Sequence, residues 1–272
     1  MIISIEGDEA TGKTTFAYTA PKPIVGFSFD MGTERALFGS KFNELFKGLS
    51  INLVSYSEGY PPLVQWDGYD ITVYELPPPI QLDTAHVSGA REQWDYFLGL
   101  VGKALRDHQV RTLVVDTMTL ARRVRVSAHL QDLQRDGGKP GAAPRRSLIQ
   151  IEYGVPNDAI RDIYSSTKGV KKNLAAIHHL TDEYKEQFVT DRKTGETRVE
   201  SAATGKRILE GLNNTYRFVD VSLRMSKSGQ EIKGLMQKFG YDLSLSGLEL
   251  DNPTWDSIVN LVNIVTEERI RF

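Results

Sequence analysis

The fold of this chain is decided by one stretch near its start, Gly7-Asp8-Glu9-Ala10-Thr11-Gly12-Lys13-Thr14. The stretch matches the pattern G-x-x-x-x-G-K-[ST] of a Walker A phosphate-binding loop at every required position. The short β-branched run from Ile2 to Ile5 precedes it and predicts a buried strand. A helix is expected to begin at Lys13 or Thr14. Between a strand and a helix, the backbone N–H groups of such a loop point inward and bind phosphate.

Each part of this loop has an expected role. Gly7 and Gly12 let the backbone turn tightly, Lys13 should reach the β and γ phosphates of ATP, and Thr14 should place its hydroxyl on Mg²⁺. The acidic side chains within the loop are expected to point away from the phosphates. The predicted nucleotide-binding set is Gly7, Asp8, Glu9, Ala10, Thr11, Gly12, Lys13, Thr14 and Thr15.

A second carboxylate is needed for the metal. The run from Val110 to Val115 is an apolar strand that ends in Asp116, as in a Walker B strand. Asp116 is therefore predicted to hold Mg²⁺ through water, together with Thr14.

The attacking water needs a base or an orienting group. Asp30 and Glu34 follow a second buried strand, and the ends of parallel strands meet at the ligand crevice. We prefer Glu34, with Asp30 and Glu6 as open alternatives. The strand from 174 to 177 carries His178 and His179 at its end, and either could contact the γ-phosphate. The predicted catalytic residues are Lys13, Glu34, Asp116 and His179.

Composition sets outer limits on the function. The chain has 272 residues, a formal net charge of -2 and no cysteine, which excludes disulfides and thiolate zinc sites. A dedicated nucleic-acid binder often has a basic excess, and the whole chain has none. Apolar runs of about 18 residues, the length of a membrane span, do not occur. We expect an intracellular, cytoplasmic protein without a membrane segment.

The order of the elements predicts an α/β fold. Strands alternate with helices in the first half, which indicates a parallel sheet, and two close-coupled strands near 218–225 and 232–239 should be antiparallel. One domain, 1–272, is expected, with a proline-rich insertion at about 51–80 and mobile loops at about 134–147 and 181–207. Within the last, Lys193-Thr194-Gly195 is read as the turn of a hairpin. The helix over 90–107 should bury Trp94, Phe97, Leu98, Val101 and Leu105.

The Walker A loop, the Phe29-Asp30 strand end with Glu34, and the Val114-Val115-Asp116-Thr117 and Ala176-Ile177-His178-His179 segments occur in one order. In this order the chain resembles the phage-encoded RecA-like ATPases, which include single-strand annealing and recombination proteins. The resemblance implies a RecA-type core, ATP hydrolysis, binding of single-stranded DNA, and homo-oligomers with ATP at the protomer junctions.

The same resemblance implies that the loops 134–147 and 181–207 face DNA. They carry several cations, although acidic residues in the second loop weaken the argument. A cation acting on the nucleotide of a neighbouring protomer could be Arg224, Lys227, Lys233 or Lys238.

Two other functions stay open. The opening Ile5-Glu6-Gly7 with the Walker loop also resembles nucleoside monophosphate kinases, for which Arg122, Arg123 and Arg125 could imitate a lid. The third reading is a nucleotide-dependent assembly protein with little turnover.

Overall fold

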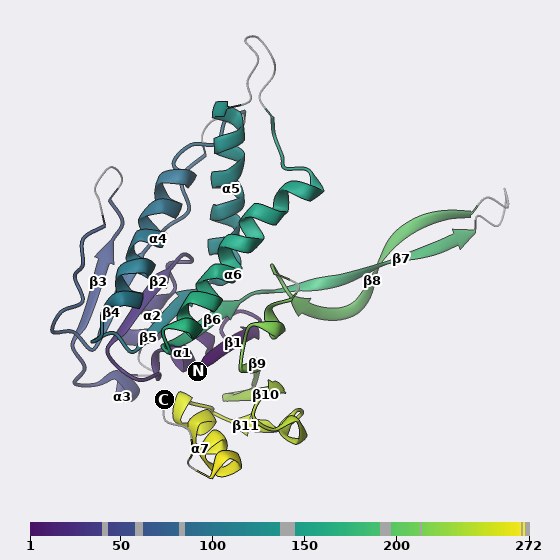
Figure 1. Ribbon diagram of the computed structural model, residues 1–272. Coiled ribbons are helices and arrows are strands. Elements are labelled where there is room, and N and C mark those ends of the chain that lie inside the picture. Colours follow the sequence, from purple (N-terminus) through teal and green to yellow (C-terminus); the bar gives the residue numbers. More distant parts are fainter. Residues whose placement is uncertain are drawn as a thin grey trace.

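The computed structural model describes residues 1–39, 43–57, 62–81, 85–136, 145–190, 197–212, 214–267 and 269. Helices and strands alternate through the first two thirds of the chain (Figure 1). The strands are β1 (Ile2–Gly7), β2 (Ile24–Ser28), β3 (Ile51–Ser55), β4 (Ile71–Glu75), β5 (Thr112–Asp116), β6 (Asn173–His178), β7 (Leu180–Thr190), β8 (Thr197–Leu209), β9 (Val221–Ser228), β10 (Glu231–Phe239) and β11 (Glu249–Asp251). The helices are α1 (Lys13–Tyr18), α2 (Thr33–Phe38), α3 (Asn43–Phe46), α4 (Ala90–Arg106), α5 (Met118–Asp136), α6 (Gly154–Gly169) and α7 (Trp255–Thr266), with 3-10 turns η1 (Gln150–Tyr153), η2 (Thr215–Arg217) and η3 (Leu243–Leu245).

One large sheet organises the molecule, with strand order β11-β10-β9-β1-β6-β5-β2-β4-β3. All neighbouring strands from β9 to β3 are parallel, and β10 and β11 are antiparallel additions. The predicted α/β fold with a parallel core and antiparallel C-terminal strands is confirmed. Because the parallel strands run the same way, the ends of β1, β2, β5 and β6 meet at one edge, which we call the carboxyl edge.

Helices cover both faces of the sheet. Residues of α4, α5 and α6 share one apolar cluster with alternate strand residues such as Ile2 and Phe27. Residues of α1 and α7 share the other cluster with Ile3 and Ile5. Successive strand residues point to opposite faces, so an apolar run such as β1 serves both clusters at once.

The long helix α4 follows its predicted pattern with one exception. Trp94, Phe97 and Val101 are buried, but Leu98 is 42% exposed and Leu100 is buried instead. The buried face of α4 is rotated from the expected one toward Gln93, Leu100 and Ala104.

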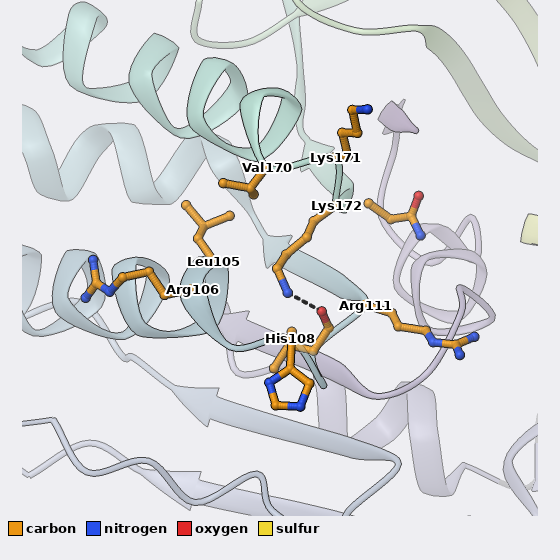
Figure 2. A pocket seen from close by; sticks show the side chains of 9 residues that line it. Leu105, Arg106, His108, Arg111, Val170, Lys171 and Lys172 are labelled. Carbon is orange, nitrogen blue, oxygen red and sulfur yellow. Dashed lines mark hydrogen bonds between the residues drawn. The ribbon is translucent and has the colours of Figure 1, made fainter. Parts of the chain in front are cut away.

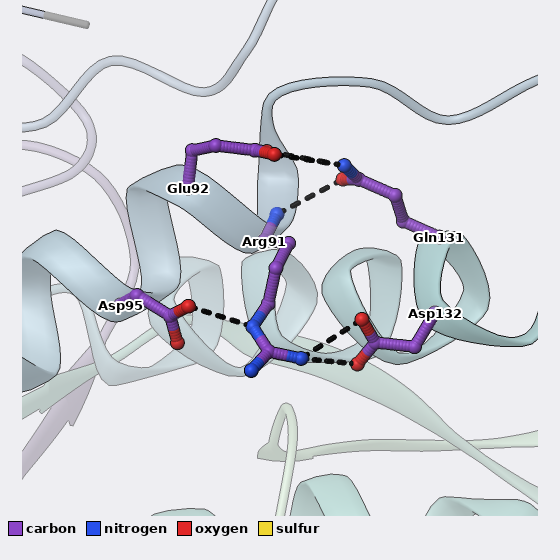
Figure 3. A network of polar contacts seen from close by, with 5 residues as sticks. All are labelled: Arg91, Glu92, Asp95, Gln131 and Asp132. Atoms are coloured by element: carbon purple, nitrogen blue, oxygen red, sulfur yellow. Dashed lines mark hydrogen bonds and ion pairs between the residues drawn. The ribbon is translucent and has the colours of Figure 1, made fainter. Parts of the chain in front are cut away.

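An ion-pair network joins α4 to α5 (Figure 3). Arg91 Nη1 lies 2.8 Å from both carboxylate oxygens of Asp132, and its Nε donates to Asp95 at 2.7 Å. Gln131 accepts from the backbone N–H of Arg91 at 2.9 Å and donates to Glu92 at 3.0 Å. The two helices are thus held by directed contacts on their exposed side as well as by the core.

The segment 51–80, predicted to be a proline-rich insertion, belongs to the main sheet. It supplies β3 and β4, which pair in parallel with each other and with β2 at one edge of the sheet. Backbone pairing is possible because the prolines lie outside both strands, and Pro62 accepts from Lys103 of α4 at 2.6 Å. In the sheet order β3 is the edge strand, and β4 lies between β2 and β3.

The segment 181–207, expected as a mobile loop, is over its described residues an antiparallel hairpin with a register shift between Asp182 and Tyr184. Strands β7 and β8 pair in antiparallel register from Leu180 with Leu209 to Thr190 with Thr197. This hairpin, which we call the arm, extends well away from the sheet (Figure 1). Its predicted turn at Lys193-Thr194-Gly195 lies outside the described residues. Most of the predicted loop 134–147 also lies outside them, since α5 continues to Asp136 and the next described residue is Arg145.

Within the described ranges, every helix is too short or too polar to cross a membrane.

Candidate nucleotide-binding site

The Walker A loop is closely packed by the β9–β10 hairpin. Gly12 has φ 81°, a left-handed backbone, and a Cβ at this position would come within 2.6 Å of Ile232 Cδ1. A Cβ on Gly7 would come within 2.4 Å of the carbonyl oxygen of Met225. Both glycines are therefore required by the neighbouring strands as well as by the turn itself.

Lys13 lies within this loop. Its Nζ donates to the carbonyl oxygens of Gly7 at 2.9 Å and Asp8 at 2.5 Å. Burial lowers the pKa of Lys13, and the carboxylate of Asp116 opposes that change. The loop thus holds a buried lysine against two of its own carbonyl oxygens, where a phosphate bound by the loop would meet it.

Thr14 and Asp116 are 102 residues apart in the chain and meet at the carboxyl edge. Thr14 Oγ1 donates to Asp116 Oδ2 at 2.7 Å. Asp116 is 1% exposed, and its Oδ1 has no hydrogen-bond partner among the described residues. Burial, with a contribution from the charge of Asp30, raises the pKa of Asp116 to about 7. The Asp116–Thr117 peptide bond is cis.

These two residues fit Mg²⁺. A buried carboxylate oxygen without a partner is costly unless a cation or a proton satisfies it, and magnesium prefers carboxylate and hydroxyl oxygens with water and phosphate completing its shell. In the part of the chain that the structure describes, no three His, Asp or Glu side chains gather as a self-sufficient metal cluster. A metal bound here would depend on the phosphates of the nucleotide.

Asp30 is exposed and accepts from the backbone N–H of Gly32 at 3.0 Å, but its charge acts on this group. Asp30 follows β2, and its charge shifts the pKa values of Lys13, Asp116 and His179. Glu34 lies exposed in the first turn of α2 and is not among the described charges that shift these three groups. The charge of Asp30 therefore makes it the candidate that acts on the phosphate site, and the choice of Glu34 stays a prediction.

The two histidines at the end of β6 have different surroundings. His178 is buried, and its Nε2 lies 3.1 Å from the hydroxyl of Tyr164, while burial lowers its pKa to about 3. His179 is half-buried, and burial and then the charge of Lys13 lower its pKa. Its backbone N–H donates to Thr119 Oγ1 at 3.1 Å. His179 is thus the histidine on the side of the phosphate loop.

Glu6, the third candidate base, is engaged elsewhere. Its buried carboxylate accepts from Arg224 Nε at 2.7 Å and lies 2.6 Å from Arg224 Nη2. In the parallel register Glu6 stands level with His178. A carboxylate held in this way is a structural partner of β9.

Most of the cations considered for action on a neighbouring protomer have partners within the chain. Arg224 pairs with Glu6, Lys233 pairs with Glu249 at 2.6 Å, and Lys238 donates to two backbone carbonyls at 2.7 Å each. Lys227 has no partner among the described residues and stands opposite the loop-packing Ile232 in the β9–β10 register.

The arginines considered as a kinase lid are held by the helix layer. Arg122 Nε donates to an asparagine of α6 at 2.9 Å, and the guanidinium of Arg125 lies 5.7 Å from the centre of the Trp94 ring. Arg123 forms an ion pair with Glu210. None of these three side chains is placed as a mobile lid over the phosphate loop.

One contact of the loop has no local sequence signal. Arg207, at the base of the arm, lies 3.2 Å from the carboxylate of Asp8 and 3.3 Å from that of Asp182. Because Asp8 and Arg207 are far apart in the chain, only the fold reveals that the arm is attached to the Walker A loop.

Comparisons with known proteins give fold-level likeness alone. No protein-family model matches the sequence, and no curated protein matches it. The structure is similar to that of the RadB recombinase, with a TM-score of 0.45, 12% identity, and coverage of 92% of this chain and 85% of that one. It is also similar to a KaiC-like protein from the archaeon Pyrococcus horikoshii OT3 (TM-score 0.36, 12% identity, 92% and 84% covered). A third similar structure is an ATPase of a bacterial type III secretion system (TM-score 0.36, 14% identity, 83% and 51% covered).

Proposed function

We propose that this protein is a RecA-like, Mg²⁺-dependent ATPase that acts on single-stranded DNA. The observation that carries the ATPase part is the contact between Thr14 and Asp116 beside Lys13, with one oxygen of the buried carboxylate left without a partner. A loop hydroxyl hydrogen-bonded to the carboxylate at the end of a neighbouring strand is the arrangement that holds Mg²⁺ in P-loop NTPases.

The residues divide the work of hydrolysis. The loop N–H groups and Lys13 bind the phosphates and offset the negative charge that develops on them. Asp30 orients a water molecule and accepts its proton, as the water oxygen bonds to the γ-phosphorus and the bond to the leaving oxygen of ADP breaks. His179 offers a neutral, polar ring to the same region. Mg²⁺, when bound by Thr14 and Asp116, would neutralise charge on the phosphate oxygens.

The DNA part of the proposal rests on the resemblance and on shape. The arm is a two-stranded ribbon that extends from the sheet and is attached at its base to the Walker A loop through Arg207 and Asp8. Such a ribbon reaches far enough to contact an extended ligand and remains connected to the nucleotide. In a homo-oligomer with ATP at its junctions, we propose Lys227, the candidate cation without a partner among the described residues, as the group that acts on the nucleotide of a neighbouring protomer.

The test is the rate of phosphate release from Mg²⁺-ATP, with and without single-stranded DNA. We expect hydrolysis that needs Mg²⁺ and increases with DNA, and we expect Asp116→Asn to abolish both. The matched control is Asp132→Asn, which removes a carboxylate from α5 far from the loop. Binding of ATP without any response to DNA would contradict the DNA part, and failure to bind ATP would contradict the whole proposal.

A further inference from the structure

A hollow of about 390 Å³ lies at the amino ends of β5 and β6, the opposite edge of the sheet from the Walker A loop (Figure 2). Its lining includes four cationic side chains, Arg106, Arg111, Lys171 and Lys172, and contains no carboxylate side chain. The ends of α4 and α6 form its walls. Nothing in the proposed ATPase mechanism uses these residues.

Three of the four cations have no acidic partner in the described part of the chain. Lys172 inserts into the hollow and donates to the backbone carbonyls of Asp107 and Val110. The side chains of Arg106, Arg111 and Lys171 are exposed, point outward around Lys172 in Figure 2, and have no acidic partner among the described residues. We call these three residues the cationic rim.

The arm carries its charges differently. Arg207 is paired with Asp8 and Asp182, and Lys185 lies 3.6 Å from Glu183. Pairing of this kind cancels most of the field that a distant phosphate would feel. The rim is therefore a group of positive charges without acidic partners among the described residues, and such a group attracts a chain of phosphates. The paired charges in the described part of the arm do so less.

Lys171 adds an independent observation. Its φ is 56°, a left-handed backbone two residues after α6, where glycine is the usual residue. A side chain costs roughly 1 kcal/mol in this conformation. At this site the strained residue is a lysine whose side chain makes no described contact. The strained position therefore indicates that the charge of Lys171 is used in binding.

The helix ends offer a competing explanation. The carboxyl ends of α4 and α6 carry partial negative charge, which nearby cations offset. That role accounts for Arg106 in the last turn of α4. It does not account for Arg111, which precedes β5 and belongs to neither helix.

We propose that the cationic rim binds the phosphate backbone of a nucleic acid strand, at a site separate from the nucleotide and from the arm. The lining has no Phe, Tyr or Trp, and its one ring is the exposed imidazole of His108, so contacts to phosphate should outweigh stacking of bases and binding should depend little on sequence. This inference rests on the proposed action on DNA and adds a second contact surface to it.

The experiment compares two triple variants in the full chain. The rim variant is Arg106→Gln, Arg111→Gln and Lys171→Gln. The control variant is Lys47→Gln, Arg161→Gln and Arg269→Gln, which removes the same charge from sites where each cation already has an acidic partner. Fluorescence anisotropy of a labelled oligonucleotide, single-stranded or duplex, is measured between about 50 and 200 mM salt.

We expect the rim variant to bind at least about tenfold more weakly at low salt. The slope of log affinity against log salt should fall by about 2 for a single strand and by slightly more for a duplex, since each lost phosphate contact removes about 0.7 or 0.9. The control should keep the wild-type slope. Chemical denaturation of the rim variant establishes that it is folded.

The outcomes separate the two proposals. Wild-type binding with an equal slope in the rim and control variants would overturn the rim and leave the action on DNA intact. No binding of any nucleic acid by the wild type would overturn both. Binding of anionic vesicles through the rim, without a change in the slope for nucleic acid, would also overturn the inference.

Discussion

The two ends of the central sheet use charge in opposite ways. At the carboxyl edge, Lys13, Thr14 and Asp116 are drawn together, and the carboxylate and the lysine are buried with altered pKa values. At the amino end, Arg106 and Arg111 are exposed and unpaired among the described residues. The first arrangement suits chemistry at one fixed point, because buried groups act strongly over short distances. The second suits an extended charged ligand, because exposed charges act additively and are screened by salt.

The largest effect is expected at the carboxyl edge. Asp30→Asn should lower the rate of ATP hydrolysis by about a hundredfold, because the water loses its orienting carboxylate. Glu34→Gln, four residues along the chain, should change the rate by less than about twofold. Steady-state phosphate release at saturating ATP measures both. An equal decrease in the rate of ATP hydrolysis in the two variants would mean that Glu34 contributes as much as Asp30 and would contradict the role given to Asp30.

The second effect is a pH dependence of stability. The pKa of Asp116 is raised from 3.8 to about 7 in the folded protein. Between these values the folded state keeps a proton that the unfolded state has lost, so the free energy of unfolding falls as the pH rises. The fall is up to about 1.4 kcal/mol for each pH unit.

Asp116→Asn should remove this part of the pH dependence, since asparagine does not titrate. Urea unfolding without nucleotide or metal, across about pH 4 to pH 7, should therefore show the variant gaining stability relative to the wild type as the pH rises. Parallel curves would show that the buried carboxylate keeps an ordinary pKa, and the contrast between the two ends would lose its electrostatic basis.

An intermediate effect is expected from the ion pairs between α4 and α5. Arg91→Ala removes contacts with Asp132 and Asp95 and should lower the free energy of unfolding by about 1 kcal/mol. Arg161→Ala removes a pair within one helix and should cost about 0.3 kcal/mol. Chemical denaturation at low salt separates the two values. If both variants lower the free energy of unfolding equally, the ion-pair network between α4 and α5 adds no more stability than a single pair within one helix.

The smallest effect belongs to the rim. Lys171→Gly relieves the left-handed backbone at this position but adds freedom to the unfolded chain, so a net gain of about 0.5 kcal/mol in the free energy of unfolding is expected. Lys171→Gln should leave stability unchanged. Both should weaken nucleic acid binding equally. A lower free energy of unfolding in both variants would assign Lys171 a structural role. The rim would then not differ from the carboxyl edge in the way proposed.

Local patterns in the sequence were enough to predict the main parts of the site. The Walker A loop and the apolar strand ending in Asp116 are both short, contiguous signals, and the parallel sheet brings their ends together without further information. The antiparallel pair β9 and β10 was likewise predicted, because a short polar turn joins two apolar runs.

Contacts that depend on backbone direction were beyond such patterns. Asp30 and Glu34 follow the same strand, and the left-handed residue Met31 and the start of α2 at Thr33 lie between them, so spacing along the chain did not separate their roles. The prolines of 51–80 suggested an insertion, although they lie outside the strands that they flank. The pair between Asp8 and Arg207 has no periodicity to detect.

The arm has a consequence for exchange of backbone amides with solvent. Two strands alone bury little apolar surface and are marginally stable in water, and Tyr184 and Val199 are exposed on them at 61% and 54%. Amides of the arm should therefore exchange with deuterium far faster than those of the central strands, which open only with the whole fold. Any ligand or neighbouring protomer that covers the arm would slow this exchange. Deuterium exchange of the arm amides would therefore detect assembly in the unlabelled protein.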